Sequence, residues 1–425
     1  MQFHKHILEN GLRLITVPMK DNPTVTVLVL VEAGSEYETK EINGLSHFLE
    51  HMCFKGTVKR PKALDISREL DGIGATYNAF TAQEYTGYYA KSDKRHFEKI
   101  LDVVSDIYLN SVFESAEIEK EKGVIVEEIN MYQDLPQKQV QENFQTLLYG
   151  DQSAGWPIAG TKEGVRSFNR DHFVAYKNKH YSASKTTVVV SGNIDEEIVS
   201  KRISEVFGSM NQSGSEGKEK TIDIQNAPVA SIEYKKTDQT HMVLGVRTYP
   251  LIEREKNRVL SVLAALLGGG MSSRLFQKLR EEMGATYYIN AGNNAFSDHG
   301  FFDISAGVDV NRLPEVVSVL LGEMKRLKDA IVPNEELQRT KDYLTGQMYL
   351  GLEASDSIAD YFGFQELFKR EIVTPDEYAK EIQKVSGEAI QKMANDIFVT
   401  QHVNLAVIGN IDTAREKDMA SLLVI

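Results

Sequence analysis

Two short segments, about half a chain length apart, have nearly the same sequence. Residues 188–195 read VVVSGNID and residues 405–412 read LAVIGNID, so each is an apolar run that ends in Gly-Asn-Ile-Asp. Self-similarity over a long period is the sequence signature of a repeated structural unit. Strand-and-turn signals also recur by chance, which is the alternative explanation. We predict a duplicated domain, each copy close to half of the 425 residues.

The length of the chain and its polar middle also indicate two domains. A chain of 425 residues exceeds what one hydrophobic core usually supports. The stretch 213–221 is polar, contains Gly and Ser and lacks apolar periodicity, which is typical of an exposed linker. We therefore expect a first domain over 1–212, a linker over 213–221 and a second domain over 222–425.

Strand and helix patterns are mixed within the first half. The residues at 12–17 alternate between apolar and polar, and the run at 25–31 is rich in β-branched residues, so both are predicted strands. Apolar positions three and four apart over 97–149 predict helices, and 186–191 predicts another strand. The predicted fold class is α+β, with two homologous mixed α/β domains, each an antiparallel-rich sheet packed with helices.

Composition and charge exclude several classes of partner. Hydrophobic residues make up 42% and charged residues 26%, as in ordinary globular proteins. The net charge of −13 would repel nucleic-acid phosphates and anionic membranes, and would attract cationic peptides. The apolar run at 24–31 is too short for a membrane-spanning helix, which needs roughly 20 residues, and the N-terminus does not read as a signal peptide. A single cysteine is typical of a reducing compartment, so we expect a soluble cytoplasmic protein.

The residues with the most chemical potential lie in a short predicted helix that contains His47, Glu50 and His51. Asn43 can cap its start and Gly56 can end it. At about 100° per residue, positions four apart share a face, so the two imidazoles can grip one ion while the glutamate lies to the side. Zinc bound by three protein ligands keeps a position for water, whose pKa it lowers, and a nearby carboxylate can take the proton.

An acidic helix predicted over 117–130 is the best source of a third ligand. Glu121 and Glu128 are seven residues apart, close to two full turns, so they project from the same face. One could bind metal while the other orients a ligand. A helix rich in Glu and Lys is equally often a solvated surface held by pairs of opposite charge, so both interpretations stay open on spacing alone.

Two other features are assigned no chemistry. Cys53 follows the second histidine closely, but free cysteine usually behaves as a small buried hydrophobe, so we expect it to pack in the helix face. The Gly-Gly-Gly run at 268–270 has no Gly-Lys-Ser/Thr after it, so it does not predict a nucleotide site.

The inverted motif His-x-x-Glu-His, followed by Glu121 and Glu128, resembles the pitrilysin and insulysin superfamily of zinc peptidases, most closely its mitochondrial-processing-peptidase-like branch. The resemblance implies that His47, His51 and Glu128 are the zinc ligands, that Glu50 is the general base, and that Glu121 is a supporting carboxylate. Glu127 is then only a neighbour. Nearly the whole chain takes part, including the blocks at 78–81, 155–161, and 273–287.

The resemblance also implies residues for substrate and a partner subunit. Asn78 and Ala79 match an edge strand to which an extended substrate adds a strand. Arg280 and Tyr287 match an Arg and Tyr pair that holds the scissile peptide and stabilises the developing oxyanion. This pair would reach the zinc of a second subunit, so a homodimer with an enclosed chamber is expected. Ala285 and Thr286 depart from the Leu-Ala that relatives commonly have there, which puts the local packing in question.

The predicted function is that of a zinc metalloendopeptidase that cleaves oligopeptides or unfolded, presequence-like segments, with one zinc ion in the first domain. The second half has no His-x-x-Glu-His of its own and would contribute walls and substrate contacts. Two alternatives remain. One is a non-catalytic scaffold or regulatory subunit, and the other is the catalytic half of a heterodimer.

Overall fold

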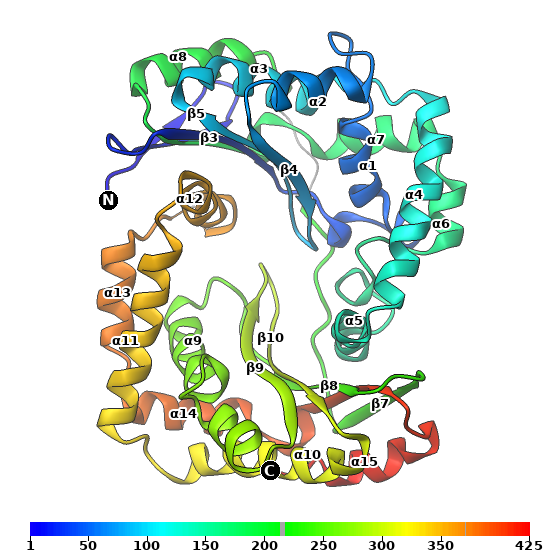
Figure 1. Ribbon diagram of the computed structural model, residues 1–425, viewed down its shortest axis with the longest axis vertical. Helices are drawn as coiled ribbons and strands as arrows, with labels where there is room; N and C mark the ends of the chain where they lie inside the picture. Colours follow the sequence, from blue (N-terminus) through cyan, green and yellow to red (C-terminus); the bar gives the residue numbers. More distant parts are fainter. Residues whose placement is uncertain (213–216, 370) are drawn as a thin grey trace. The chain divides into compact units, whose positions relative to one another are not determined.

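The computed structural model describes residues 1–212, 217–369 and 371–425 (Figure 1). The predicted linker therefore lies partly outside the described residues, and its described part, 217–221, has no helix or strand. The chain forms two compact units, and each takes a segment from the opposite half of the sequence. The first contains Met1–Ile129, Trp156–Glu219 and Tyr349–Pro375, and the second contains Asn130–Gly155, Lys220–Met348 and Asp376–Ile425. The predicted division into 1–212 and 222–425 did not include this exchange.

The first unit is built on a six-stranded mixed sheet in the order β1-β2-β6-β3-β5-β4. β2 and β6 pair in parallel, and the other neighbouring strands are antiparallel. The strands predicted near 12–17, 25–31 and 186–191 are β2, β3 and β6. The strand bounds are β1 (His4–Ile7), β2 (Arg13–Pro18), β3 (Thr24–Val31), β4 (Thr76–Thr81), β5 (Thr86–Asp93) and β6 (Thr186–Gly192).

Helices cover both faces of this sheet (Figure 1). A strand covered on both faces reads as a continuous apolar run, which is the pattern of β3. One face packs against α12 (Ser355–Lys369), a helix from the second half of the chain, through Ile358 and Phe362. The other face packs against α1 (Leu45–Cys53), α2 (Ala63–Asp71), α3 (Phe97–Leu109), α7 (Arg170–His180) and α8 (Glu196–Phe207).

The second unit repeats the same arrangement of strands. Its sheet has the order β7-β11-β8-β10-β9, with β7 and β11 parallel and the other pairs antiparallel. This order matches β2-β6-β3-β5-β4 position by position, and the two strands that end in the repeated glycine, β6 and β11, occupy the same place. The predicted duplication is confirmed. The strands are β7 (Val229–Tyr234), β8 (Thr240–Arg247), β9 (Thr286–Ala295), β10 (Gly300–Val308) and β11 (Val403–Gly409).

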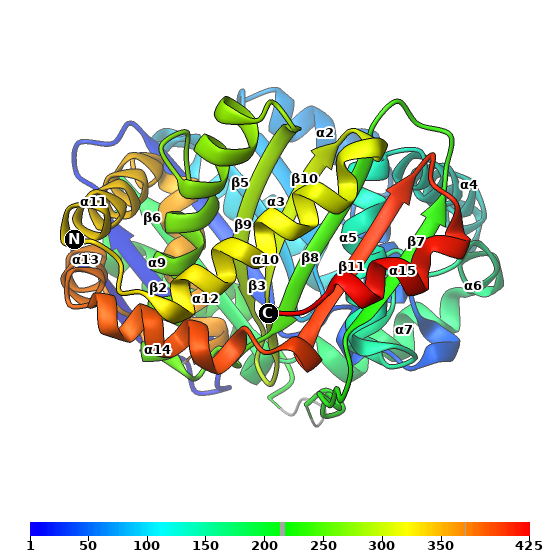
Figure 2. The same ribbon diagram turned by 90° about the horizontal axis from the view of Figure 1, so that it is seen from below.

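Helices also cover both faces of the second sheet. α5 (Pro136–Tyr149), which comes from the first half of the chain, packs on one face through Val140, Phe144 and Leu148. Figure 2 shows α10 and α15 crossing the other face. The helices of the main core are α9 (Arg254–Gly268), α10 (Leu313–Asp329), α11 (Asn334–Gly351), α13 (Pro375–Gln383), α14 (Gly387–Ile397) and α15 (Glu416–Leu422).

The helical region predicted over 97–149 consists of α3, α4 (Ser115–Gln133) and α5. α6 (Lys162–Ser167) is a short helix before α7. None of the helices in the described parts of the chain is both long enough and apolar enough to cross a membrane.

Candidate metal centre

Helix α1 begins after a glycine and is capped by a buried carboxylate from the preceding loop. Gly44 has a φ of 97°, in the left-handed region that favours glycine. Glu38 accepts hydrogen bonds from the backbone N–H of Gly44 at 2.8 Å and of Ser46 at 2.6 Å, which are donors that a helix start leaves unpaired. Asn43, the predicted cap, instead donates from its amide to Glu38 at 3.0 Å. The prediction that Asn43 caps this helix was therefore wrong.

The position of α1 is also fixed by a close backbone crossing. Gly160 has a φ of 70°, and a Cβ on it would lie 2.3 Å from the carbonyl oxygen of Asn43. A Cβ on Gly44 would lie 2.6 Å from the carbonyl oxygen of Ala159. Only glycines allow this approach, which explains why the block at 155–161 contains a glycine at this point.

The inner face of α1 is apolar and buried, with Phe48, Leu49 and Met52 in the core of the first unit. Cys53 is fully buried and its thiol lies 3.5 Å from the hydroxyl of Tyr88, as expected for a packed cysteine. The helix ends at Cys53, three residues before Gly56, the predicted end.

The two histidines of α1 face Glu128 on α4. Nε2 of His47 lies 3.7 Å from Oε2 of Glu128, and Nε2 of His51 lies 3.5 Å from the same oxygen. All the ligand atoms of this set lie within 4.8 Å of one another. These distances are too long for hydrogen bonds, which are about 2.7–3.2 Å. Tetrahedral ligands at about 2.1 Å from zinc are about 3.4 Å apart, so the set fits a single zinc ion.

The chemistry of the donors fits zinc as well. Two imidazoles and one carboxylate form a ligand set that is known at catalytic zinc sites, and imidazole must be neutral to bind metal. Burial, with a smaller effect of His51, lowers the pKa of His47 to about 4, so this ring is neutral at physiological pH. Nδ1 of His47 is buried and has no hydrogen-bond partner among the described residues.

Glu121 supports His51 from behind. Its Oε1 lies 2.9 Å from Nδ1 of His51, and its Oε2 lies 2.6 Å from Nζ of Lys55. Burial alone would lower the pKa of His51, but the hydrogen bond to Glu121 and the charges of the nearby carboxylates raise it overall. Burial alone would raise the pKa of Glu121, but its bonds to His51 and Lys55 lower it overall. The sequence did not lead us to predict Lys55 as part of the site, although its spacing of four residues from His51 could have indicated that it lies nearby.

Glu50 is held by the strand at the edge of the sheet. The hydroxyl of Thr81, at the end of β4, donates to Oε2 of Glu50 at 2.6 Å. Burial raises the pKa of Glu50, and this hydrogen bond partly opposes the rise. Thr81 lies inside the block at 78–81, but the sequence gave no sign of its contact with Glu50. Glu127 is exposed, unlike its neighbour Glu128.

Asn78 and Ala79 lie on β4, which is an edge strand of the first sheet. Asn78 is exposed, whereas Ala79 is buried and packs in the core on the side of α1. The structure therefore brings His47, Glu50, His51, Glu121 and Glu128 together in one unit, with this edge strand beside them.

Arg280 and Tyr287 belong to the second unit, where they are near neighbours. Arg280 lies on a π-helical segment, Phe276–Glu282, and donates to the carbonyl of Thr286 at 2.8 Å. Tyr287 follows on the edge strand β9 and is 60% exposed. Ala285 is buried in the core, so the local departure from the commoner sequence is accommodated by packing.

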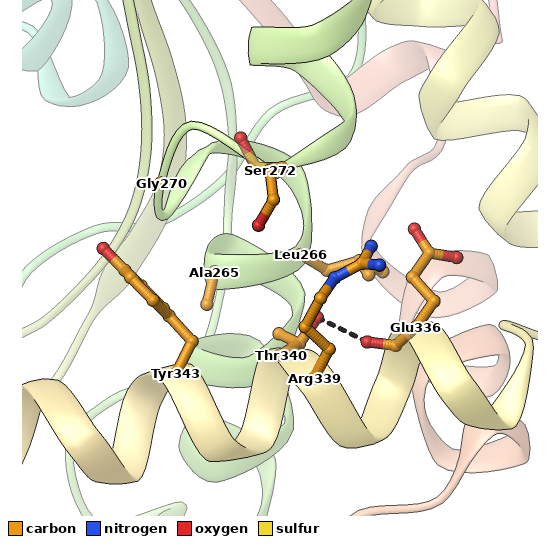
Figure 3. Close-up of a pocket in the computed structure, with 9 residues that line it drawn as sticks. Ala265, Leu266, Gly270, Ser272, Glu336, Arg339, Thr340 and Tyr343 are labelled. Atoms are coloured by element: carbon orange, nitrogen blue, oxygen red, sulfur yellow. Dashed lines mark hydrogen bonds between the residues drawn. The ribbon is translucent and has the colours of Figure 1, made fainter.

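The pocket in Figure 3 contains none of the predicted site residues. It lies between the turn at Gly270 and Ser272 and the side chains of Arg339 and Tyr343 on α11 (Figure 3). Its volume of about 20 Å³ is room for about one water molecule. It offers no space for a nucleotide.

Comparison with known proteins gives consistent matches along the chain. Residues 13–162 match the family model described as Insulinase (Peptidase family M16), and residues 167–344 match the model described as Peptidase M16 inactive domain. The chain is 35% identical to an uncharacterized zinc protease of Bacillus subtilis, over 95% of this chain and 98% of that protein. It is 34% identical to an uncharacterized zinc protease of Rickettsia bellii, over 96% of this chain and 97% of that protein.

Two solved structures share the fold. A protease from Helicobacter pylori matches with a TM-score of 0.88 and 21% identity, over 96% of this chain and 99% of that chain. A peptidase M16 inactive domain from Pseudomonas fluorescens matches with a TM-score of 0.89 and 15% identity, over 97% of this chain and 99% of that chain.

Proposed function

The chain belongs to the insulinase family of peptidases, family M16, and from this membership we propose that it is a zinc metalloendopeptidase that hydrolyses oligopeptides and unfolded, presequence-like segments. The observation that supports this most directly is the spacing of His47, His51 and Glu128, whose ligand atoms lie within 4.8 Å of one another. The naming of its relatives as zinc proteases supports zinc as the metal, held by these three residues.

A bound zinc ion would supply Lewis-acid polarisation of the scissile carbonyl and lower the pKa of water. Glu50 is the proposed general base: it accepts the proton of the attacking water and returns it to the leaving amine. The Thr81 hydroxyl donates a hydrogen bond to Oε2 of Glu50, so Oε1 remains available to accept that proton. Glu121 orients His51 through its Nδ1, which fixes the tautomer that presents Nε2 to the ligand set.

The proposed substrate is an extended peptide that pairs with β4. An edge strand presents unpaired backbone N–H and C=O groups, and an added strand satisfies them through main-chain hydrogen bonds. Asn78 and Ala79 lie on this strand, and its last residue, Thr81, contacts Glu50. A peptide bound along β4 would therefore lead to the base. Because the backbone makes most of the contacts, flexible segments are favoured over folded proteins.

Arg280 and Tyr287 are proposed to bind the peptide and stabilise the oxyanion from a second subunit, which makes the active species a homodimer. The support is that the Tyr287 side chain is 60% exposed and that Arg280 donates to the backbone of the adjacent Thr286. The two side chains therefore lie close together, and Tyr287 is accessible to a partner. Hydrogen-bond donors that are preorganised around a developing oxyanion are a common source of rate enhancement.

The test is hydrolysis of a quenched fluorogenic peptide library by the purified protein, with zinc measured on the same sample. Glu50→Gln should abolish cleavage and retain zinc, because the base is lost but the ligands remain. Glu127→Gln is the matched control, since Glu127 is an exposed residue on the helix that carries Glu128. This control should cleave as wild type.

Each contrary result has a definite meaning. Zinc without cleavage of any peptide would refute the enzyme and favour a non-catalytic scaffold. Cleavage that appears only when a second protein is added would replace the homodimer with a heterodimer. Undiminished cleavage by Glu50→Gln would remove Glu50 from the mechanism.

A further inference from the structure

A cavity of about 230 Å³ opens beside β4, on the face of the first sheet that α12 covers. A water molecule takes about 30 Å³ in the liquid, and pockets for drug-sized ligands measure about 300–1,000 Å³. The cavity is therefore suited to one extended side chain rather than to a cofactor. Its lining comes from three strands and one helix of the first unit and includes Leu28, Asn78, Phe80, Tyr89, Asp356 and Asp360.

The cavity reaches the edge of the sheet through one row of paired residues. Leu28 on β3 pairs with Tyr89 on β5, and Tyr89 pairs with Asn78 on β4. The row runs from the buried centre of the sheet to Asn78, which is exposed on the edge strand. The cavity therefore adjoins the edge at which the peptide is proposed to pair.

Successive residues of a strand point to opposite faces of a sheet, and this alternation separates two functions along β4. Thr81 lies on the α1 face and contacts Glu50, and Ala79 packs on that same face. Asn78 and Phe80 line the cavity on the α12 face. In a peptide paired with β4, the residue opposite Thr81 would lie near Glu50. The residues one and three positions along would face the cavity.

The charges in the cavity leave one carboxylate without a cation. Asp356 and Asp360 are one turn apart on α12, so they share a face. Asp356 pairs with Lys91 at 2.8 Å, whereas no hydrogen bond or ion pair joins Asp360 to another described residue. Burial, together with the charge of Asp356, raises the pKa of Asp360 to about 6. A cation placed beside Asp360 would offset both the poor solvation of its buried charge and the repulsion from Asp356.

We propose that this cavity is a specificity pocket for a lysine or arginine side chain of the bound peptide, with Asp360 as its counter-ion and Tyr89 as its aromatic wall. The proposal rests on the proposed function, because it names the substrate class of the same site. The aliphatic stem would pack on Phe80, next to the edge strand, and the charged end would lie between the carboxylate and the ring, where cation–π attraction adds to the ion pair.

The experiment measures peptide binding without cleavage, in the Glu50→Gln background, by fluorescence anisotropy. A neutral peptide carries one lysine or one norleucine at each position in turn, at about 0.15 M salt so that long-range attraction to the acidic chain is screened. Lysine should bind about tenfold more tightly than norleucine at one position, or at two positions two residues apart. In Asp360→Asn this advantage should fall to less than about twofold, while the norleucine peptides bind as before.

Two variants separate the pocket from general electrostatics. Asp21→Asn removes the same charge from an exposed turn before β3 and should leave the lysine advantage intact. Asp360→Lys should reverse the preference at the same position, so that glutamate binds better than lysine.

The proposed pocket would be refuted if lysine peptides bound more tightly than norleucine peptides by the same factor at every position, or if the difference survived in Asp360→Asn. Failure of the wild-type protein to cleave any peptide would instead refute the proposed function. The pocket would still stand if the positional pattern and its loss in Asp360→Asn were observed.

Discussion

Replacement of Glu121 by glutamine tests how far the proposed metal centre depends on this carboxylate. Glu121 is 4% exposed and bonds to Nδ1 of His51 at 2.9 Å and to Lys55 at 2.6 Å. Glutamine keeps the shape but loses the charge that holds the imidazole and pairs with Lys55. Loss of such a partner typically weakens metal binding about 10–100-fold, or about 1.4–2.7 kcal/mol. Zinc affinity is measured by competition with a chromogenic chelator at neutral pH.

The control for this substitution is Glu119→Gln on the same helix. Glu119 is 68% exposed and pairs with Lys122, so its replacement should change zinc affinity by less than about twofold. The reasoning is refuted if Glu121→Gln binds zinc as tightly as wild type and the Glu119 control. In that case the contact between Glu121 and His51 would have no part in organising the ligands.

Four further expectations concern the supports of the site and the helix that carries Glu128. Thr81→Val should lower kcat about tenfold with KM little changed, because Glu50 loses the hydroxyl that orients it, whereas Thr81→Ser should restore the rate; steady-state kinetics on one peptide decides this. Gly160→Ala should lower the thermal midpoint and weaken zinc binding, since its Cβ would lie 2.3 Å from a carbonyl oxygen at a φ of 70°, at a cost above about 1 kcal/mol. Gly123→Ala lies inside α4, where the added Cβ would meet no heavy atom of the described residues within 4 Å apart from its own helix backbone and chain neighbours. It should instead stabilise by about 0.5–1 kcal/mol in the same thermal scans, and a loss of stability there would contradict the helix-propensity reasoning. Burial raises the pKa of Glu38 from 4.5 to about 7, so the folded state binds more protons between these values and the stability falls as pH rises through them, by roughly 3 kcal/mol at most. The thermal midpoint of wild type should therefore fall more than that of Glu38→Gln from pH 5 to pH 8, and parallel pH profiles would show that Glu38 is not the group responsible.

The short-range features of the site follow from sequence because they depend on the geometry of single elements. His47 and His51 share a face since four residues make slightly more than one turn of helix. The spacing of Glu121 and Glu128 on α4 follows in the same way. Whether these carboxylates faced a metal or solvent stayed open, because their spacing does not say what packs against that face. The structure places Glu128 at 3.5 Å and 3.7 Å from the two histidines.

Contacts between distant residues could not be predicted in this way. Thr81 reaches Glu50 because β4 packs beside α1, and nothing in the sequence around either residue encodes that packing. Glu38 caps α1 from a preceding loop, in place of the adjacent Asn43. A capping side chain needs only to reach the free N–H groups, so its distance along the chain is not fixed.

The sequence by itself determined the duplication, the shared helix face of His47 and His51 and the main strands, because repeats, helical spacing and apolar runs are properties of neighbouring residues. Only the tertiary structure decided that α12 of the second half covers the first sheet and that α5 of the first half covers the second. An apolar helix face is satisfied by any complementary sheet, so its pattern predicts burial but not the partner. The cavity that places Asp360 beside the edge strand exists because of that choice of partner.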